Sequence, residues 1–210
     1  MHESAWQSII GNLIDDRTQK PRATGLTMVL DTGVGLGQLR DTLELAGHCI
    51  DHWKLGFGTS VFHSKQALQQ KLELLAEQRI LSFPGGTLLE VALIEHHCRD
   101  YMRKARQLGF TAVEISDGTI PMPDFRRKNI IHCALDAGLV AITEVGKKDP
   151  RQQPSAEQVA EQALTDLENG ASWVVMEGRE SGRGVGIFGE HGQVLDEAVA
   201  TIMTLMGAAC

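Results

Sequence analysis

Four cationic residues in this sequence fall in short segments that also contain glycine and that overlap or follow aliphatic runs. Lys54 opens one such segment, Lys147 and Lys148 lie side by side in another, and Arg179 lies in a third. Arginine binds carboxylate or phosphate through two parallel hydrogen bonds, and a lysine that faces a pocket can transfer a proton. Because Lys147 and Lys148 are adjacent, we expect one to face a site and the other to face solvent. These residue types predict a site for a small anionic molecule.

Two glycine-rich stretches suit a bound oxyanion. The first, residues 56–60, includes the hydroxyls of Thr59 and Ser60, and the second opens with Ser181 and Gly182. Glycine lets a backbone approach an anion closely, and a helix N-terminus directs N–H donors at it. Any one of these glycines could serve only as a turn residue. Together with the cations they favour an anion-binding site.

Carboxylates occur among the same cations. Asp117, Glu144 and Glu177 each follow or end an aliphatic run. Carboxylate oxygens are the ligands that hard divalent cations prefer, so these residues indicate a metal ion, most simply Mg²⁺. A structural salt bridge remains the alternative for any one of the three.

Alternating strand and helix patterns position these segments. Ser64 can cap a helix, Ser155 and Gln158 have the spacing of a capping box, and Gly170 can end the second helix. Strands and helices in series indicate parallel strands whose carboxyl ends share one rim, where ligands bind. The expected strands are the aliphatic runs 26–30, 52–57, 79–83, 112–115, 139–143 and 173–176.

About six strand–helix units are expected over the chain, which we interpret as a single α/β domain at residues 1–210. A closed (β/α)₈ barrel usually needs eight units and about 250 residues. Periodicity alone leaves an open doubly wound sheet as the alternative.

Composition excludes several classes of function. A net charge of −7 argues against nucleic-acid binding, which usually requires a basic face. No apolar stretch approaches the roughly 18 residues of a membrane span, and residues 1–19 lack the apolar segment of a secretory leader. The four cysteines are widely spaced, which favours free thiols in a cytoplasmic enzyme over a zinc site.

The segments above, in their order and spacing, resemble the successive strand-end signatures of the phosphosulfolactate synthase family. The resemblance implies a TIM (β/α)₈-type barrel and a Mg²⁺-dependent lyase that adds sulfite to phosphoenolpyruvate, giving (2R)-phospho-3-sulfolactate. In methanogens this reaction begins coenzyme M synthesis, and related proteins elsewhere make sulfolactate. The segments that carry the resemblance are residues 25–31, 54–60, 84–88, 114–118, 144–148 and 177–186.

The resemblance also implies roles for individual residues. Lys148 is the expected general acid, and Lys54 is expected to hold the substrate carboxylate or phosphate. Arg179 and the loop that begins at Ser181 would bind phosphate or sulfite. The partners are then the small molecules phosphoenolpyruvate and sulfite, while assembly into a homo-oligomer stays open.

Two departures from the family pattern matter. Asp31-Thr32-Gly33 stands where the family often has Asp-Lys-Gly, so one cation is missing. After Gly192 the sequence contains one apolar helix, residues 195–206, in place of the last two strand–helix units. We therefore expect an incomplete barrel. The alternatives are an inactive relative with a stress-associated or binding role, and a barrel enzyme that acts on another enolate-forming phosphorylated acid.

Overall fold

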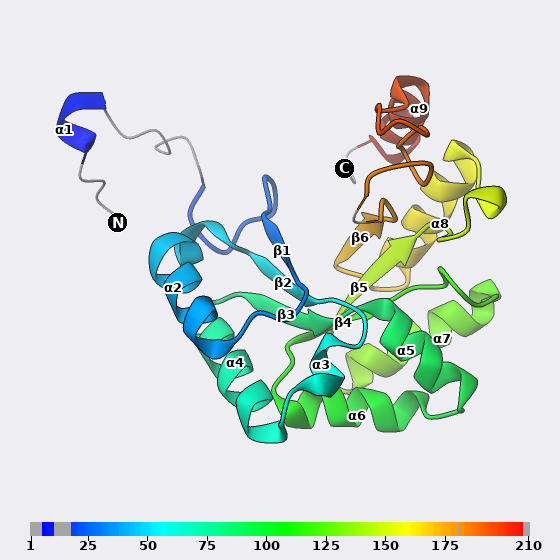
Figure 1. The fold of residues 1–210 in the computed structure, drawn as a ribbon. Helices are drawn as coiled ribbons and strands as arrows, with labels where there is room; N and C mark the ends of the chain where they lie inside the picture. The colour runs from blue at the N-terminus through cyan, green and yellow to red at the C-terminus, as the bar shows by residue number, and fades with distance from the viewer. Residues whose placement is uncertain (1–5, 11–17, 180, 208–210) are drawn as a thin grey trace. The chain divides into compact units, whose positions relative to one another are not determined.

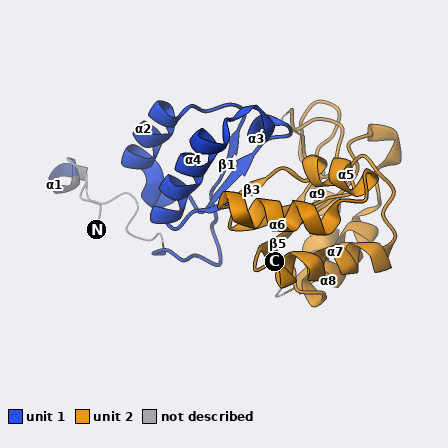
Figure 2. Cartoon of the chain, turned by 90° about the horizontal axis from the view of Figure 1, so that it is seen from below, with its two compact units in different colours: residues 1–82 blue, residues 83–210 orange. Residues whose placement is uncertain are grey.

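The computed structural model describes residues 6–10, 18–179 and 181–207. The chain divides into two compact units, residues 1–82 and residues 83–210 (Figure 2). The expected absence of a leader concerns residues 1–19, most of which lie outside the described residues, as does Cys210. The interpretation of residues 1–210 as one domain stays a prediction.

A three-stranded sheet contains β1, β2 and β3, and the first unit ends within β3. Strands β1 and β2 pair in parallel, with Met28 opposite His52 and Asp31 opposite Leu55, and β3 follows in the order β1-β2-β3. Ser64 caps helix α4 as predicted, because its Oγ accepts a hydrogen bond from Ala67 N at 3.2 Å. The elements, labelled in Figure 1, are α1 (Gln7–Ile10), β1 (Met28–Asp31), α2 (Leu36–Ala46), η1 (Gly47–Cys49), β2 (His52–Leu55), α3 (Thr59–Phe62), α4 (Lys65–Glu77) and β3 (Leu81–Pro84).

The second unit contains a second parallel sheet, in the order β4-β5-β6. Its core includes Phe83, Ala112 and Ile142, and the half-buried Trp173 packs against them. Every residue of β4 is buried, as expected for a strand of a parallel sheet with covered faces. The elements are α5 (Gly86–Ile94), α6 (Cys98–Leu108), β4 (Ala112–Ile115), α7 (Asp124–Asp136), β5 (Val140–Val145), η2 (Pro150–Gln152), α8 (Ala156–Glu168), β6 (Trp173–Met176) and α9 (Asp196–Met206).

Local sequence signals account for most helix boundaries in this unit. The predicted capping box is present, since Ser155 Oγ accepts from Gln158 N while Gln158 Oε1 accepts from Ser155 N. Gly109 and Gly170 adopt positive φ angles of 109° and 103° at helix ends, a conformation in which a side chain would be strained. The predicted apolar helix after Gly192 corresponds to α9.

The α/β class with parallel strands is therefore confirmed. The described residues contain six strands, arranged as two three-stranded sheets. Strands β4 and β6 match their predicted bounds, and the other four overlap theirs with ends shifted by no more than two residues. No helix within the described ranges is long and apolar enough to cross a membrane. Cys49, Cys98 and Cys133 are free thiols, as predicted.

Candidate active site

Two buried glutamates lie at the carboxyl ends of neighbouring strands in the second unit. Glu144 lies near the end of β5 and Glu177 directly follows β6, and both are more than nine-tenths buried. Burial raises the pKa of Glu177 above its ordinary value, and the negative charge of Glu144 raises it further. The N–H of Arg179, 2.7 Å from Glu177 Oε1, and the positive charge of Lys148 oppose this shift without cancelling it. The pair therefore attracts a positive charge, either a proton or a cation.

Lys148 supplies a cation beside this pair. Its Nζ donates a hydrogen bond to Thr87 Oγ1 at 2.6 Å and lies 3.8 Å from Glu177 Oε2. A third of the side chain is exposed to solvent. The ammonium group is thus held by a hydroxyl and a carboxylate, while part of the side chain is open to solvent. A proton donor in an active site requires both properties.

Glu90, which the sequence prediction did not identify, joins α5 to the loop after β4. The side chain is fully buried and accepts hydrogen bonds from Ser116 and Thr119 hydroxyls and from Gly118 N and Thr119 N. Burial alone would raise the pKa of Glu90, but these hydrogen bonds and the charge of Lys148 outweigh it and lower the pKa. Glu90 is therefore an ionised carboxylate with a full set of donors.

The start of α5 lies against the end of β4. Gly86 N donates to Glu114 Oε2 at 2.6 Å, and a methyl group at position 86 would lie 2.8 Å from Ser116 Cβ. Only glycine permits this approach. The segment Pro84-Gly85-Gly86-Thr87 therefore holds Thr87 within hydrogen-bonding distance of Lys148. The sequence alone did not predict this contact.

Asp117, the third predicted metal ligand, is engaged in ion pairs. Its carboxylate contacts Arg127 Nη1 at 3.2 Å and Lys147 Nζ. Arg127 is almost fully buried and also binds Asp166, with the shortest contact at 2.6 Å. Lys147 thus pairs with Asp117 while Lys148 lies beside Glu177, so the two lysines have different partners, but neither is the solvent-facing lysine that we expected.

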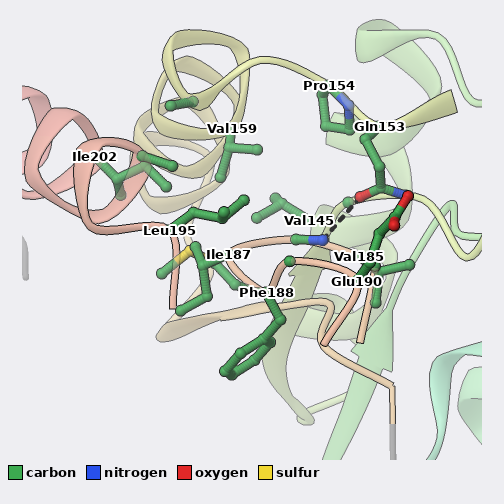
Figure 3. Close-up of a pocket in the computed structure, with 17 residues that line it drawn as sticks. Val145, Gln153, Pro154, Val159, Val185, Ile187, Phe188, Glu190, Leu195 and Ile202 are labelled. Carbon is green, nitrogen blue, oxygen red and sulfur yellow. Dashed lines mark hydrogen bonds between the residues drawn. The ribbon is translucent and has the colours of Figure 1, made fainter. Parts of the chain in front are cut away.

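The loop predicted to bind an oxyanion begins with exposed polar residues and continues into residues that line an apolar cavity. Arg179 and Ser181 are exposed, and Arg179 and Gly182 have φ angles of 52° and 57°. The following residues line a cavity of about 300 Å³ whose walls are mainly aliphatic (Figure 3). Gly186 N donates to Gln153 Oε1 at 2.9 Å, so this N–H is already bound. The cavity itself does not suit a phosphate group, because its lining offers few polar partners.

The remaining predicted residues belong to the first unit. Lys54 is half-buried on β2, and Thr59 and Ser60 begin α3 after Gly58, whose φ is 75°. That Lys54 joins Lys148 at one mouth, as the family resemblance implies, stays a prediction. Asp31 is fully buried and binds Lys71 Nζ at 2.6 Å and Trp53 Nε1 at 2.9 Å, which fixes the end of β1.

The glutamate pair also fits a divalent cation. Glu177 Oε2 is buried and accepts no hydrogen bond from the described residues. Mg²⁺ is often held by one or two carboxylates, with water and substrate oxygens completing its coordination. No group of three or more His, Cys, Asp or Glu side chains in the described ranges is placed to hold a metal. Glu144 and Glu177 are therefore the residues whose surroundings suit such an ion, and the metal role of Asp117, which is engaged in ion pairs, stays a prediction.

Fold and site together define a class of protein: an α/β protein with parallel strands and acid–base groups at strand carboxyl ends, the usual location of active sites in this class. The model of the family "(2R)-phospho-3-sulfolactate synthase (ComA)" matches residues 15–209, and the chain belongs to this family.

Three relatives named phosphosulfolactate synthase support the assignment. The protein of Methanothermobacter thermautotrophicus is 37% identical over 187 residues, which cover 88% of this chain and 72% of the relative. The Methanocaldococcus jannaschii protein is 39% identical over 172 residues, covering 81% and 68%. The Bacillus subtilis protein is 36% identical over 190 residues, covering 90% and 74%.

Solved structures support the fold. A crystal structure of 2,3-dimethylmalate lyase, described as a member of the PEP mutase/isocitrate lyase superfamily, is similar with a TM-score of 0.53 at 13% identity. The match covers 87% of this chain, and the chain spans 64% of that protein. At this identity the likeness concerns the fold alone.

Proposed function

We propose that this chain is a lyase that joins sulfite to phosphoenolpyruvate to give (2R)-phospho-3-sulfolactate. The observation that carries the proposal is the Lys148 ammonium group, 3.8 Å from the buried Glu177 at the carboxyl ends of β5 and β6. The name of the family and the names of the relatives specify the product, and the substrates are those that the family resemblance implies. The proposal includes a (β/α)₈-type barrel with about six of its units present, and a cytoplasmic location.

The reaction needs one nucleophilic addition and one proton transfer. The sulfur lone pair of sulfite forms a bond to C3 of phosphoenolpyruvate. The C2–C3 π electrons move toward C2 and the carboxylate, which produces an enediolate-like intermediate. Lys148 Nζ then donates a proton to C2 and recovers one from solvent through its exposed side. Fixed cations stabilise the negative charge that develops on the substrate carboxylate.

Other residues bind and orient the substrates. Thr87 holds the Lys148 ammonium group, Lys54 binds the carboxylate or phosphate, and Arg179 with Ser181 and Gly182 binds phosphate or sulfite. Thr59 and Ser60 add hydroxyl and N–H donors for the same groups. Glu144 and Glu177 would hold Mg²⁺, which supplies positive charge beside the substrate carboxylate when it is bound.

A turnover assay with a matched lysine variant tests the proposal. Wild-type protein, sulfite, phosphoenolpyruvate and Mg²⁺ should yield phosphosulfolactate, detected by mass spectrometry. Lys148→Ala should lower kcat by about 10²- to 10⁴-fold, the usual contribution of a general acid. Lys104→Ala, at an exposed position of α6, should retain wild-type kcat.

Two results would contradict different parts of the proposal. Turnover that survives in Lys148→Ala would remove Lys148 from the mechanism. Folded wild-type protein without turnover would favour an inactive relative, and turnover only with a different phosphorylated acid would favour a related lyase.

A further inference from the structure

Helix α5 presents two polar side chains on one face. Thr87 and Glu90 are three residues apart, so they lie one above the other on the helix surface. The rest of α5 is mainly apolar, and Leu89 and Leu93 are buried in the core. A fully buried carboxylate in such a helix is unfavourable unless it is well supplied with donors.

The donors to Glu90 come from one short loop. Glu90 Oε1 accepts from the Ser116 hydroxyl and from Gly118 N at 3.1 Å. Glu90 Oε2 accepts from Thr119 N at 2.8 Å and from the Thr119 hydroxyl. Two side-chain donors and two backbone donors thus converge on one carboxylate, which fixes the path of the loop after β4.

This loop supports Lys148 directly. Lys148 N donates to Gly118 O at 3.2 Å, and a methyl group at position 118 would lie 3.0 Å from Lys148 Cε. The aliphatic part of Lys148 therefore lies against the Gly118 backbone. One turn earlier on α5, Thr87 Oγ1 accepts a hydrogen bond from the Lys148 ammonium group.

We propose that Glu90 is a positioning residue, which holds Gly118 and Thr119 so that the Lys148 ammonium group stays between Thr87 and Glu177. The proposal rests on the function proposed for Lys148. Thr87 fixes the end of the lysine side chain, and Glu90 fixes the surface along which that side chain lies. Glu90 has no role toward the substrate itself.

The first test replaces the carboxylate by its isostere. In Glu90→Gln the amide oxygen can still accept two hydrogen bonds. The NH₂ group, however, is a donor and takes the place of the other carboxylate oxygen, so it faces a second donor, either Gly118 N or Thr119 N. The loop therefore loses one backbone hydrogen bond without a change in volume. Glu95→Gln, at the exposed end of the same helix, is the matched control.

The kinetic prediction separates positioning from general stability. Glu90→Gln should lower kcat by about 10- to 100-fold, a range typical of a displaced catalytic group, while the KM values of both substrates change by less than about threefold. Glu95→Gln should match the wild type. In a Lys148→Ala background, Glu90→Gln should change kcat by less than about twofold, because the group through which it acts is absent. A full additional loss in that background would overturn the proposal.

Two further measurements keep the test decisive. Thr119→Val removes one donor to Glu90 with little change in shape, so it should also lower kcat, even if Glu90→Gln folds poorly.

Amide hydrogen exchange followed by NMR does not depend on enzyme activity. Glu90→Gln should accelerate exchange at the amides of Gly118, Thr119 and Lys148. Faster exchange at Gly118 and Thr119 with unchanged exchange at Lys148 would refute the link. Absence of turnover with faster exchange at all three residues would contradict only the proposed function.

Discussion

Removal of Asp166 should strongly destabilise the second unit. Asp166 on α8 accepts from Arg127 Nε at 2.8 Å and from Arg127 Nη2 at 2.6 Å, and both side chains are almost fully buried. Asp166→Ala leaves a guanidinium group buried without its main partner, a change that typically costs about 3–5 kcal/mol. Arg127 keeps a hydrogen bond from Nη2 to Glu144 O at 3.0 Å and a longer contact to the partly exposed Asp117 at 3.2 Å, so we expect the lower end of this range, about 3 kcal/mol.

Urea unfolding followed by circular dichroism measures this loss. Glu161→Ala, an exposed position on the same helix, should change the free energy of unfolding by less than about 0.5 kcal/mol. The double variant Arg127→Met/Asp166→Leu should be more stable than Asp166→Ala, because apolar side chains then replace both charges. A loss below about 1 kcal/mol in Asp166→Ala, or a double variant less stable than the single one, would refute the assignment of a buried, mutually dependent pair.

Two predictions concern pH and metal. Burial would raise the pKa of Asp31, but hydrogen bonds from Lys71, Trp53 and two backbone N–H groups outweigh it and lower the pKa. The stabilisation from Asp31 is then present above the unfolded-state pKa of about 3.9 and is lost as pH falls through the folded-state pKa. Asp31→Asn should therefore be less stable than the wild type at pH 7, with a difference that shrinks below about pH 4 in thermal unfolding; a difference independent of pH would contradict this. Removal of divalent cations with EDTA should abolish turnover, and added Mg²⁺ should restore it, whereas full turnover in EDTA would exclude the metal role of Glu144 and Glu177.

Local patterns predicted the elements well because local forces determine them. The Ser64 cap, the Ser155–Gln158 capping box and the turn at Gly170 after α8 all depend on interactions within a few residues of the chain. Such signals are readable in a single sequence. The alternation of strands and helices likewise predicted the parallel order within each sheet, since a strand–helix–strand unit brings its strands side by side.

The residues that support the site were not predictable in the same way. Glu90 contacts residues 26 to 29 positions away, and Arg127 contacts Asp166, 39 positions away. Only the fold brings such partners together. The one available signal was a charged residue inside an otherwise apolar helix, which marks Glu90. The ion pairs of Asp117 with Arg127 and Lys147 were not predictable either, because nothing local in the sequence indicates them, and its role as a metal ligand stays a prediction.

The source of the hydrogen that C2 gains in the product tests the central claim most directly. We expect the wild-type protein, incubated with sulfite and phosphoenolpyruvate in D₂O, to form phosphosulfolactate with one deuterium at C2 and none at C3, as read by NMR. That pattern requires sulfur to add at C3 and an exchangeable acid to protonate C2. Release of pyruvate and phosphate without a carbon–sulfur bond, or deuterium at C3, would contradict the proposed reaction.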